Sequence, residues 1–165
     1  MQTLLSQIKN CKVCEQHLVG GVNPVVSASV QSKIVIVGQA PGRIVHNTGI
    51  AWNDKSGDNL RSWLGVDKAT FYNTELVAVI PMGFCYPGTG KTGDLPPRPE
   101  CAPLWHQQLL SQMPNVELML LVGQYAQNYY LGTSARNTLT ETVRHYQDYL
   151  PRYFPLPHPS CRVHY

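Results

Sequence analysis

The sequence predicts an α/β fold, a three-layer α/β/α sandwich around a central, mainly parallel four-stranded sheet. Two observations support this prediction. Short apolar runs rich in β-branched residues recur between turn residues, which is typical of strands buried on both faces. Helical patterns lie between these runs, and strands that alternate with helices form parallel sheets covered by helices. The 165 residues, 43% of them hydrophobic, have the size of one domain, so we expect a single domain over residues 1–165.

Four segments are predicted as strands. They are KIVIVG (33–38), ELVAVI (75–80), VELMLLVG (116–123) and RYFPLP (152–157). Because the ligands of such sheets bind beyond the carboxyl ends of the strands, the residues that follow each strand are the first candidates for function. These residues are GQAPG (38–42), PMGFCYPG (81–88), GQYAQ (123–127) and HPS (158–160).

Four helices are predicted around the strands. They cover residues 56–65, 99–113, 123–132 and 138–150. Ser56 is a candidate cap of the first helix, and the second begins at a proline. Thr138, followed three residues later by Glu141, forms a capping box at the start of the last helix.

Charge and apolar content restrict the class of protein. The formal net charge of +3 permits a polyanionic partner without requiring one. No apolar run approaches the roughly 20 residues of a membrane span, and the N-terminus has no secretory signal. We therefore expect a cytoplasmic protein without membrane contact, in which the five cysteines are ligands or small buried side chains rather than disulfides.

The stretch CYPGTGKTGD (85–94) is one residue away from a phosphate-binding loop, because Cys85 replaces the first glycine of G-x-x-x-x-G-K-[ST]. Such a loop must lead into a helix, whose N-terminus holds the phosphates. Thr92 is instead followed by GDLPPRPE, which is too rich in glycine and proline for a helix. We predict a surface loop.

Four cysteines are spaced as possible ligands. Cys11 and Cys14 form a C-x2-C pair, and Cys85 and Cys101 lie on either side of the Gly/Pro-rich loop. Four thiolates can hold a zinc ion or an iron-sulfur cluster. Four unrelated buried cysteines remain the alternative.

Three motifs in order resemble the uracil-DNA glycosylase superfamily: GQAPG after the first strand, then Gly49 and Trp52, then HPS near the C-terminus. The cysteine spacing resembles the family 4-like branch, in which four cysteines hold a 4Fe-4S cluster. The similarity extends from Cys11 to Ser160. It implies a DNA glycosylase that hydrolyses the N-glycosidic bond of uracil, or of another deaminated base, as the first step of base excision repair.

The resemblance also implies roles for single residues. The expected partner is DNA that contains uracil or a related damaged base, bound by a monomer. Trp52 should stack on the extruded base, His158 should donate to a carbonyl oxygen of the base, and Ser160 should hold a DNA phosphate. The cluster is expected to fix loops rather than to react, with zinc as the alternative. The water-positioning loop should consist of Gly38, Gln39, Ala40, Pro41 and Gly42.

The chain departs from the family pattern at the positions where related proteins have carboxylates. Gln39 stands where related proteins have glutamate, Ala40 where another branch has aspartate, and Val45 and His46 where a second acidic residue is usual. A glutamine amide can orient a water but cannot take its proton, so His46 is the natural substitute base, with a surface loop position as its alternative reading. The empty positions leave a second possibility, a catalytically impaired iron-sulfur protein of the same fold that binds nucleic acid.

Two more departures concern base reading and the C-terminus. In the neighbourhood where the family usually has an asparagine that reads the base, this chain has Pro81 and Met82. Selectivity for uracil should therefore come from backbone groups or elsewhere. After HPS only CRVHY remains, so the wedge loop and closing helix of the family are not expected in this chain. In this tail we expect Arg162 to be a cation near the site and Cys161 to be a free thiol.

Lys55, Lys91 and Arg98 are candidate phosphate contacts on loops near the expected DNA face.

Overall fold

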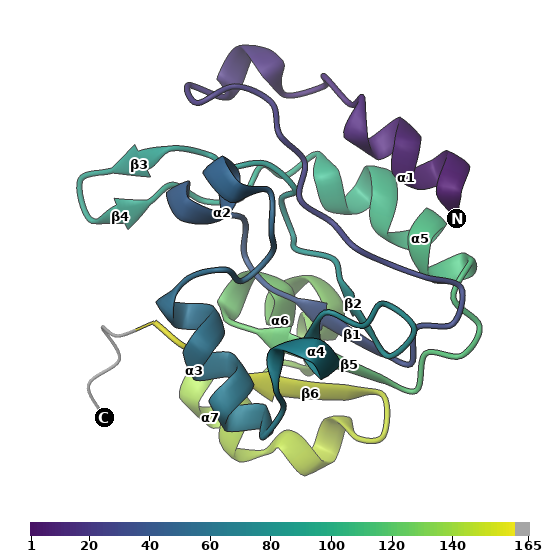
Figure 1. The fold of residues 1–165 in the computed structure, drawn as a ribbon. Coiled ribbons are helices and arrows are strands. Elements are labelled where there is room, and N and C mark those ends of the chain that lie inside the picture. Colours follow the sequence, from purple (N-terminus) through teal and green to yellow (C-terminus); the bar gives the residue numbers. More distant parts are fainter. Residues whose placement is uncertain (161–165) are drawn as a thin grey trace.

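The fold was described from a computed structural model, in which residues 1–160 are placed. Its centre is a four-stranded parallel sheet with the strand order β2-β1-β5-β6 (Figure 1). The strands are β1 (Ile34–Val37), β2 (Val77–Val79), β5 (Leu118–Val122) and β6 (Tyr153–Leu156). Val35 pairs with Ala78 on one side and with Met119 on the other. The four predicted strands and the parallel sheet are confirmed.

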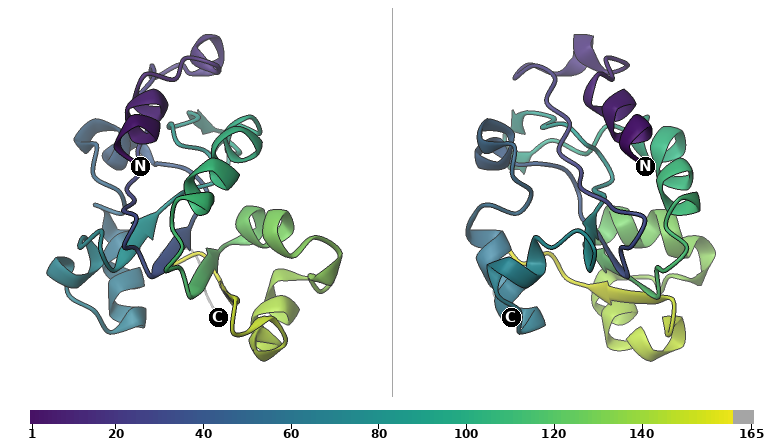
Figure 2. Two further views of the ribbon diagram at one scale, coloured as in Figure 1. Left: turned by 90° about the vertical axis from the view of Figure 1, so that its right-hand side faces the viewer. Right: turned by 45° about the vertical axis from the view of Figure 1, so that its right-hand side comes forward.

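Side chains of β1 alternate between two cores, as expected when both faces of a sheet are covered. Val35 and Val37 face one core, and Ile36 faces the other. The first core is closed by α1 (Gln2–Lys9), α5 (Gln107–Ser111) and α6 (Gln124–Leu131), and the second by α3 (Lys55–Leu64) and α4 (Lys68–Phe71). Figure 2 shows helices on both sides of the sheet, so the three-layer fold is confirmed.

The remaining helical segments are short. They are η1 (Glu15–His17), α2 (Arg43–Thr48), the π-helical turn η2 (Ala102–His106) that leads into α5, η3 (Gly132–Ser134), α7 (Leu139–Arg144) and η4 (Tyr146–Tyr149).

Helix caps match the sequence at one site and differ at another. The Thr138 side chain accepts a hydrogen bond from the Glu141 amide, as the capping box predicts. The cap of α3 is Asp54, which accepts from the Gly57 amide, whereas Ser56 lies inside the helix. The prediction of Ser56 as the cap was therefore wrong by two residues, because the helix already begins at Lys55.

The GTGKT stretch forms a small antiparallel hairpin, β3 (Thr89–Gly90) and β4 (Gly93–Asp94), which projects beside α2 (Figure 1). No helix follows it directly, which agrees with the prediction that it is not a phosphate-binding loop. Cys161 and Arg162 lie outside the described residues. None of the helices within residues 1–160 is long and apolar enough to cross a membrane.

Candidate functional site

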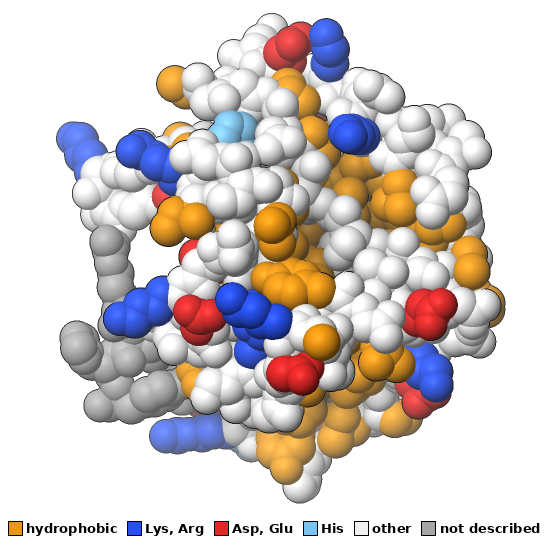
Figure 3. All heavy atoms as spheres, viewed as in Figure 1, with side chains coloured by type: hydrophobic (Ala, Val, Ile, Leu, Met, Phe, Trp, Pro, Cys, Tyr) orange, Lys and Arg blue, Asp and Glu red, His pale blue; other side chains and the backbone are white. Residues whose placement is uncertain are grey.

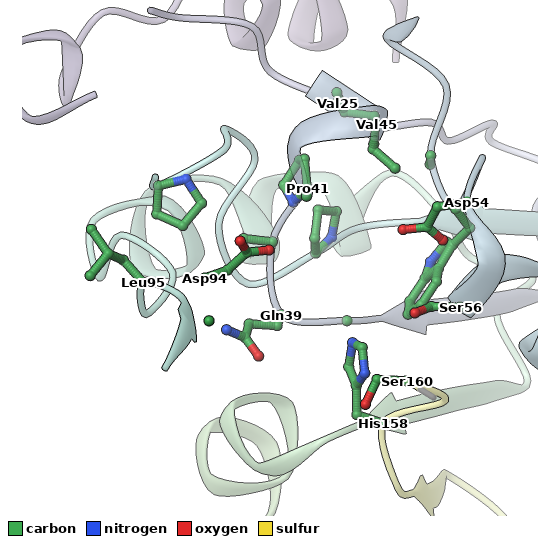
Figure 4. Close-up of a pocket in the computed structure, with 18 of the residues that line it drawn as sticks. Val25, Gln39, Pro41, Val45, Asp54, Ser56, Asp94, Leu95, His158 and Ser160 are labelled. Carbon is green, nitrogen blue, oxygen red and sulfur yellow. The ribbon is translucent and has the colours of Figure 1, made fainter. Parts of the chain in front are cut away.

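A cavity of about 570 Å³ opens at the carboxyl ends of β1, β2 and β6 (Figure 4), the edge at which a ligand was expected. All five residues of GQAPG contribute to its lining, and so do Trp52, His158 and Ser160. The fold therefore brings HPS together with two motifs, GQAPG and Trp52, that precede it by more than 100 residues in the sequence. The other lining residues are Val25, Val45, Ala51, Asp54, Ser56, Val79, Pro81, Pro87, Thr89, Thr92, Gly93, Asp94 and Leu95.

The GQAPG loop is held by its backbone. The Met82 amide donates to the Gly38 carbonyl at 2.8 Å, and the Gly83 amide donates to the Gln39 carbonyl at 2.9 Å. These bonds continue the pairing of β1 with the chain that leaves β2. The Gln39 side chain is not needed for this pairing, and Figure 4 shows it at the cavity.

Trp52 has a backbone conformation that is rare for a bulky residue. Its φ of 56° lies in the left-handed region, which costs about 1–3 kcal/mol. The Trp52 carbonyl accepts a hydrogen bond from Nη1 of the buried Arg61 at 3.2 Å. Its ring lies against Gly38, where an added Cβ would be 2.8 Å from Cζ2 of Trp52. Strain at a cavity, sustained by a buried hydrogen bond, points to a functional position for this ring.

A second glycine makes room for Trp52. A Cβ at Gly57 would lie 1.7 Å from the Trp52 carbonyl oxygen, so this position in the first turn of α3 accepts only glycine. Arg61 also forms an ion pair with Asp58, which precedes it by three residues in the same helix, and the distance from Nη2 of Arg61 to Oδ1 of Asp58 is 2.8 Å. Two residues of α3 thus hold the Trp52 carbonyl: Gly57 allows its close approach, and Arg61 donates a hydrogen bond to it.

His158 lies beside Trp52 in the lining of the cavity. The two ring centroids are 6.0 Å apart with an interplanar angle of 36°. The turn that carries His158 is anchored at Pro159, whose carbonyl accepts a hydrogen bond from Nδ2 of Asn59 at 3.0 Å. Pro157 and Pro159 restrict the backbone on either side of the histidine.

Burial determines the charge of His158. Loss of solvation lowers the pKa of His158 below its ordinary value of 6.5, and the negative charges of Asp54 and Asp94 offset part of this effect. The imidazole is accordingly neutral at neutral pH. A neutral ring has one N–H donor and one acceptor nitrogen, and therefore suits a role as hydrogen-bond donor rather than as cation.

The cavity is lined by two carboxylates, and neither belongs to the family motifs. Figure 4 shows Asp94 on the side of Gln39 and Pro41, and Asp54 on the opposite side near Ser56. Asp94 belongs to the segment that the sequence predicted as a surface loop. No local pattern identifies it, because its proximity to GQAPG arises only from folding.

His46 lies away from the cavity. Its Nε2 is 3.0 Å from the Gly20 carbonyl oxygen, and its ring is 5.7 Å from that of Tyr86. Its Nδ1 is buried and has no hydrogen-bond partner among the described residues. His46 is also not among the described residues that line the cavity, so the fold does not bring it together with Gln39 and His158. The expected substitute base, His46, instead contacts the N-terminal loop at Gly20.

The base-reading position has no side-chain donor. Pro81 lines the cavity, but its carbonyl is occupied by Nε2 of the buried His106 at 2.9 Å. Met82 is buried and apolar. As expected from the sequence, these two side chains offer no hydrogen bond to a base.

The four spaced cysteines meet at a second, smaller cavity, beneath η1 and next to η2. Cys11, Cys14, Cys85 and Cys101 all line it, together with apolar side chains such as Phe84 and Trp105. All four are free thiols, and burial raises the pKa of Cys101 to about 12. Among residues 1–160, no three His, Cys, Asp or Glu side chains are arranged to hold a single metal ion.

The candidate phosphate contacts differ in their availability. Lys91, at the turn of the hairpin, and Lys55, at the start of α3, are exposed. Arg98 is instead bound to Glu100, with Nε at 3.1 Å from Oε2, and it lines the cysteine cavity. Figure 3 shows Lys and Arg side chains along the hairpin edge of the molecule, interspersed with acidic ones.

A comparison with known protein families gives one match. The family model of the uracil DNA glycosylase superfamily matches residues 25–165. The matched segment contains GQAPG, Trp52 and HPS, while Cys11 and Cys14 precede it.

Proposed function

The chain belongs to the uracil DNA glycosylase superfamily, and we propose on this basis that it hydrolyses the bond between uracil, or another deaminated base, and deoxyribose in DNA. One observation supports this activity above all others. Gln39, Trp52 and His158 line one cavity at the carboxyl ends of the parallel strands. A glycosylase needs such a cavity, because the target base must leave the stack before its bond to the sugar is accessible.

Trp52 would form the stacking wall of the site. Stacking on an aromatic side chain contributes about 1–3 kcal/mol per base, which offsets part of the cost of extruding the nucleotide. The contact with Gly38 and the hydrogen bond from Arg61 hold the ring before any base arrives. A wall that is already ordered loses little further entropy on binding.

His158 would stabilise the departing base. As the bond to the sugar breaks, negative charge grows on the base and its carbonyl oxygens. An imidazole N–H directed at such an oxygen acts like an oxyanion-hole donor, whose removal typically costs on the order of a hundredfold in rate. The pKa of His158 is lowered by loss of solvation, so the donor at neutral pH is a neutral imidazole.

Gln39 would orient the attacking water. Its amide carbonyl accepts a hydrogen bond from the water but cannot take the proton. Gly38, Ala40, Pro41 and Gly42 would hold this loop close to the sugar, and Ser160 would contact the adjacent phosphate. The exposed Lys91 on the hairpin would add a phosphate contact at the rim.

The cysteine cavity supports the family 4-like, iron-sulfur branch. Its four free thiols, which share the lining with Arg98 and mainly apolar side chains, fit the all-thiolate ligand set of a 4Fe-4S cluster. In a reducing compartment such as the cytoplasm, this cluster would be held by Cys11, Cys14, Cys85 and Cys101. The cluster would crosslink these segments. Since Cys85 and Cys101 bracket the β3–β4 hairpin, it would fix the base of the hairpin that reaches the first cavity.

The activity is tested with a labelled single-stranded oligonucleotide that contains one uracil. Excess protein should release uracil and leave an abasic site that alkali cleaves, and His158→Ala should lower the rate at least about a hundredfold. Oligonucleotides with hypoxanthine or xanthine at the same position report on base selectivity.

The alternative predicts a different result in the same assay. If the wild-type protein binds the oligonucleotide but leaves the uracil in place at enzyme excess, the chain is a binding protein of the same fold. The carboxylates of Asp54 and Asp94 in the cavity favour the enzyme, because they restore the acidic groups that GQAPG lacks.

A further inference from the structure

The β3–β4 hairpin carries a carboxylate into the cavity, and the family pattern gives it no role. We propose that Asp94 is a catalytic residue that binds the attacking water and takes its proton. This inference rests on the proposed glycosylase activity. It supplies the proton acceptor that Gln39 cannot provide.

Position is the first argument for Asp94. Its carboxylate lies at the GQAPG loop, and a Cβ added to Gly42 would be 3.5 Å from Oδ2 of Asp94. In Figure 4 it lies beside Gln39 and Pro41. A water placed between the Gln39 amide and the Asp94 carboxylate would therefore have one group to orient it and a second to accept its proton.

The hairpin holds Asp94 in place from behind. Asp94 pairs with Thr89 in the two-stranded ladder, and the Leu95 amide donates to the Gly88 carbonyl at 2.8 Å. The Thr89 hydroxyl is 3.5 Å from Oδ1 of Asp94 and also contacts the hydroxyl of the buried Tyr86. The carboxylate is thus connected through Thr89 to the protein interior, and Oδ2 is the atom nearer the water-positioning loop.

Asp54, the other carboxylate in the cavity, is a weaker candidate. Its Oδ1 accepts the Gly57 amide at 2.9 Å as the cap of α3, and it lies on the opposite side of the cavity from Gln39. Oδ1 of Asp54 is thus already engaged in a structural hydrogen bond at the start of α3. His46 is also a weaker candidate than Asp94, because it contacts Gly20 and is not among the described residues that line the cavity.

The proposed step balances as follows. A lone pair of the water oxygen forms a bond to C1′ of the deoxyribose, while the bond from C1′ to the base nitrogen breaks and its electron pair leaves with the base. One proton of the water passes to Asp94 and then to solvent. The base anion, bound by His158, takes a proton from solvent on release. The products are the free base and an abasic site.

The Asp94 carboxylate and the neutral His158 N–H donor have complementary roles in this step. The sugar becomes positive and the base negative as the bond breaks, so a carboxylate near the sugar and an N–H donor near the base both stabilise the transition state. The two groups line the same cavity, and the negative charge of Asp94 opposes the lowering of the His158 pKa by burial.

The test compares Asp94→Asn with Glu75→Gln, which removes one exposed negative charge beside the amino end of β2, the edge of the sheet opposite the cavity. Single-turnover excision of uracil is measured at enzyme excess. Affinity is measured with an oligonucleotide that contains 2′-fluoro-2′-deoxyuridine, which resists cleavage. Asp94→Asn should lower the rate about a hundredfold or more, as expected for loss of a general base, without weakening the affinity. Glu75→Gln should cleave at the wild-type rate.

A second variant, Asp94→Ala, separates proton transfer from a structural role. Added formate should accelerate Asp94→Ala at least about tenfold by replacing the missing carboxylate, and should not accelerate the wild-type protein. The proposal is overturned if Asp94→Asn cleaves within about threefold of wild type, or if formate leaves the rate of Asp94→Ala unchanged. Wild-type protein that does not cleave would instead reject the proposed glycosylase activity itself.

Discussion

At the scale of single residues, the site depends on close contacts that only small side chains permit. Gly38 allows the Trp52 ring to lie directly on the end of β1, and Gly57 accommodates the Trp52 carbonyl. The sequence identified GQAPG, Trp52 and His158 through their motifs. It could not identify Asp94, whose carboxylate approaches Gly42 although the two residues are 52 positions apart in the chain.

Gly38→Ala should impair excision through Trp52 alone. The new methyl group would lie 2.8 Å from Cζ2 of Trp52, so the ring must shift out of the stacking position. We expect the rate to fall about tenfold or more, in line with the energy of one base–aromatic stack. Gly20→Ala is the matched control, because its methyl group makes only ordinary contacts of 3.5 and 3.6 Å outside the site. Equal rates for the two variants would show that Trp52 does not stack on the base.

At the scale of elements, the strands were the easiest to predict. β1, β2 and β5 are short, largely buried apolar runs, whereas β6 is mostly half-buried. The short length of the runs and their bounding turn residues favoured strands over helices. The helices α1, α2 and α4 were not predicted. α2 and α4 span only six and four residues, which is too few turns for a clear periodicity. The β3–β4 hairpin was expected as an irregular loop, since its strands have only two residues each.

The junction of η2 with the sheet contains a pH-sensitive group. His106 is almost fully buried, its Nε2 donates to the Pro81 carbonyl, and its Nδ1 accepts from the Tyr130 hydroxyl at 2.7 Å. Loss of solvation lowers its pKa to about 4. In the unfolded chain the pKa returns to its ordinary range near 6.5, so the unfolded state binds the proton first and stability falls as the pH drops from about 6.5 towards 4.

His106→Phe should remove this pH dependence. The variant loses two hydrogen bonds and should be less stable than wild type at pH 7.5. The difference between the two proteins should shrink by about 2 kcal/mol at pH 5, because only the wild type carries the protonation penalty there. Urea unfolding at several pH values measures this difference. A stability difference that stays constant between pH 7.5 and 5 would mean that His106 is not held neutral by the fold.

At the scale of the whole molecule, one segment of the chain connects two cavities: its ends, Cys85 and Cys101, line the cysteine cavity, and its middle lines the first cavity. The β3–β4 hairpin lies between Cys85 and Cys101 in the chain, and its residues Thr89, Asp94 and Leu95 line the first cavity. The cysteine spacing predicted that the four thiols would meet, and they do line a common cavity. The connection between this cavity and the site could not be predicted, since it depends on the path of the hairpin.

Loss of the proposed cluster should therefore disturb the site at a distance. The purified protein should be brown, with an absorption band near about 400 nm, and Cys101→Ala should lose the band and lower the melting temperature. Cys161→Ser, at the fifth cysteine of the sequence, is the matched control and should keep both. A colourless protein that contains one zinc ion would identify the alternative ligand, and an unchanged band in Cys101→Ala would refute the proposed ligand set.

The most direct measurement for the whole account is a crystal structure of the protein bound to an oligonucleotide with 2′-fluoro-2′-deoxyuridine. The account predicts a uracil turned out of the strand, stacked on the Trp52 ring, with a carbonyl oxygen within hydrogen-bond distance of His158 and the sugar facing Gln39. A uracil that remains stacked in the strand, or that binds away from these three side chains, would contradict it.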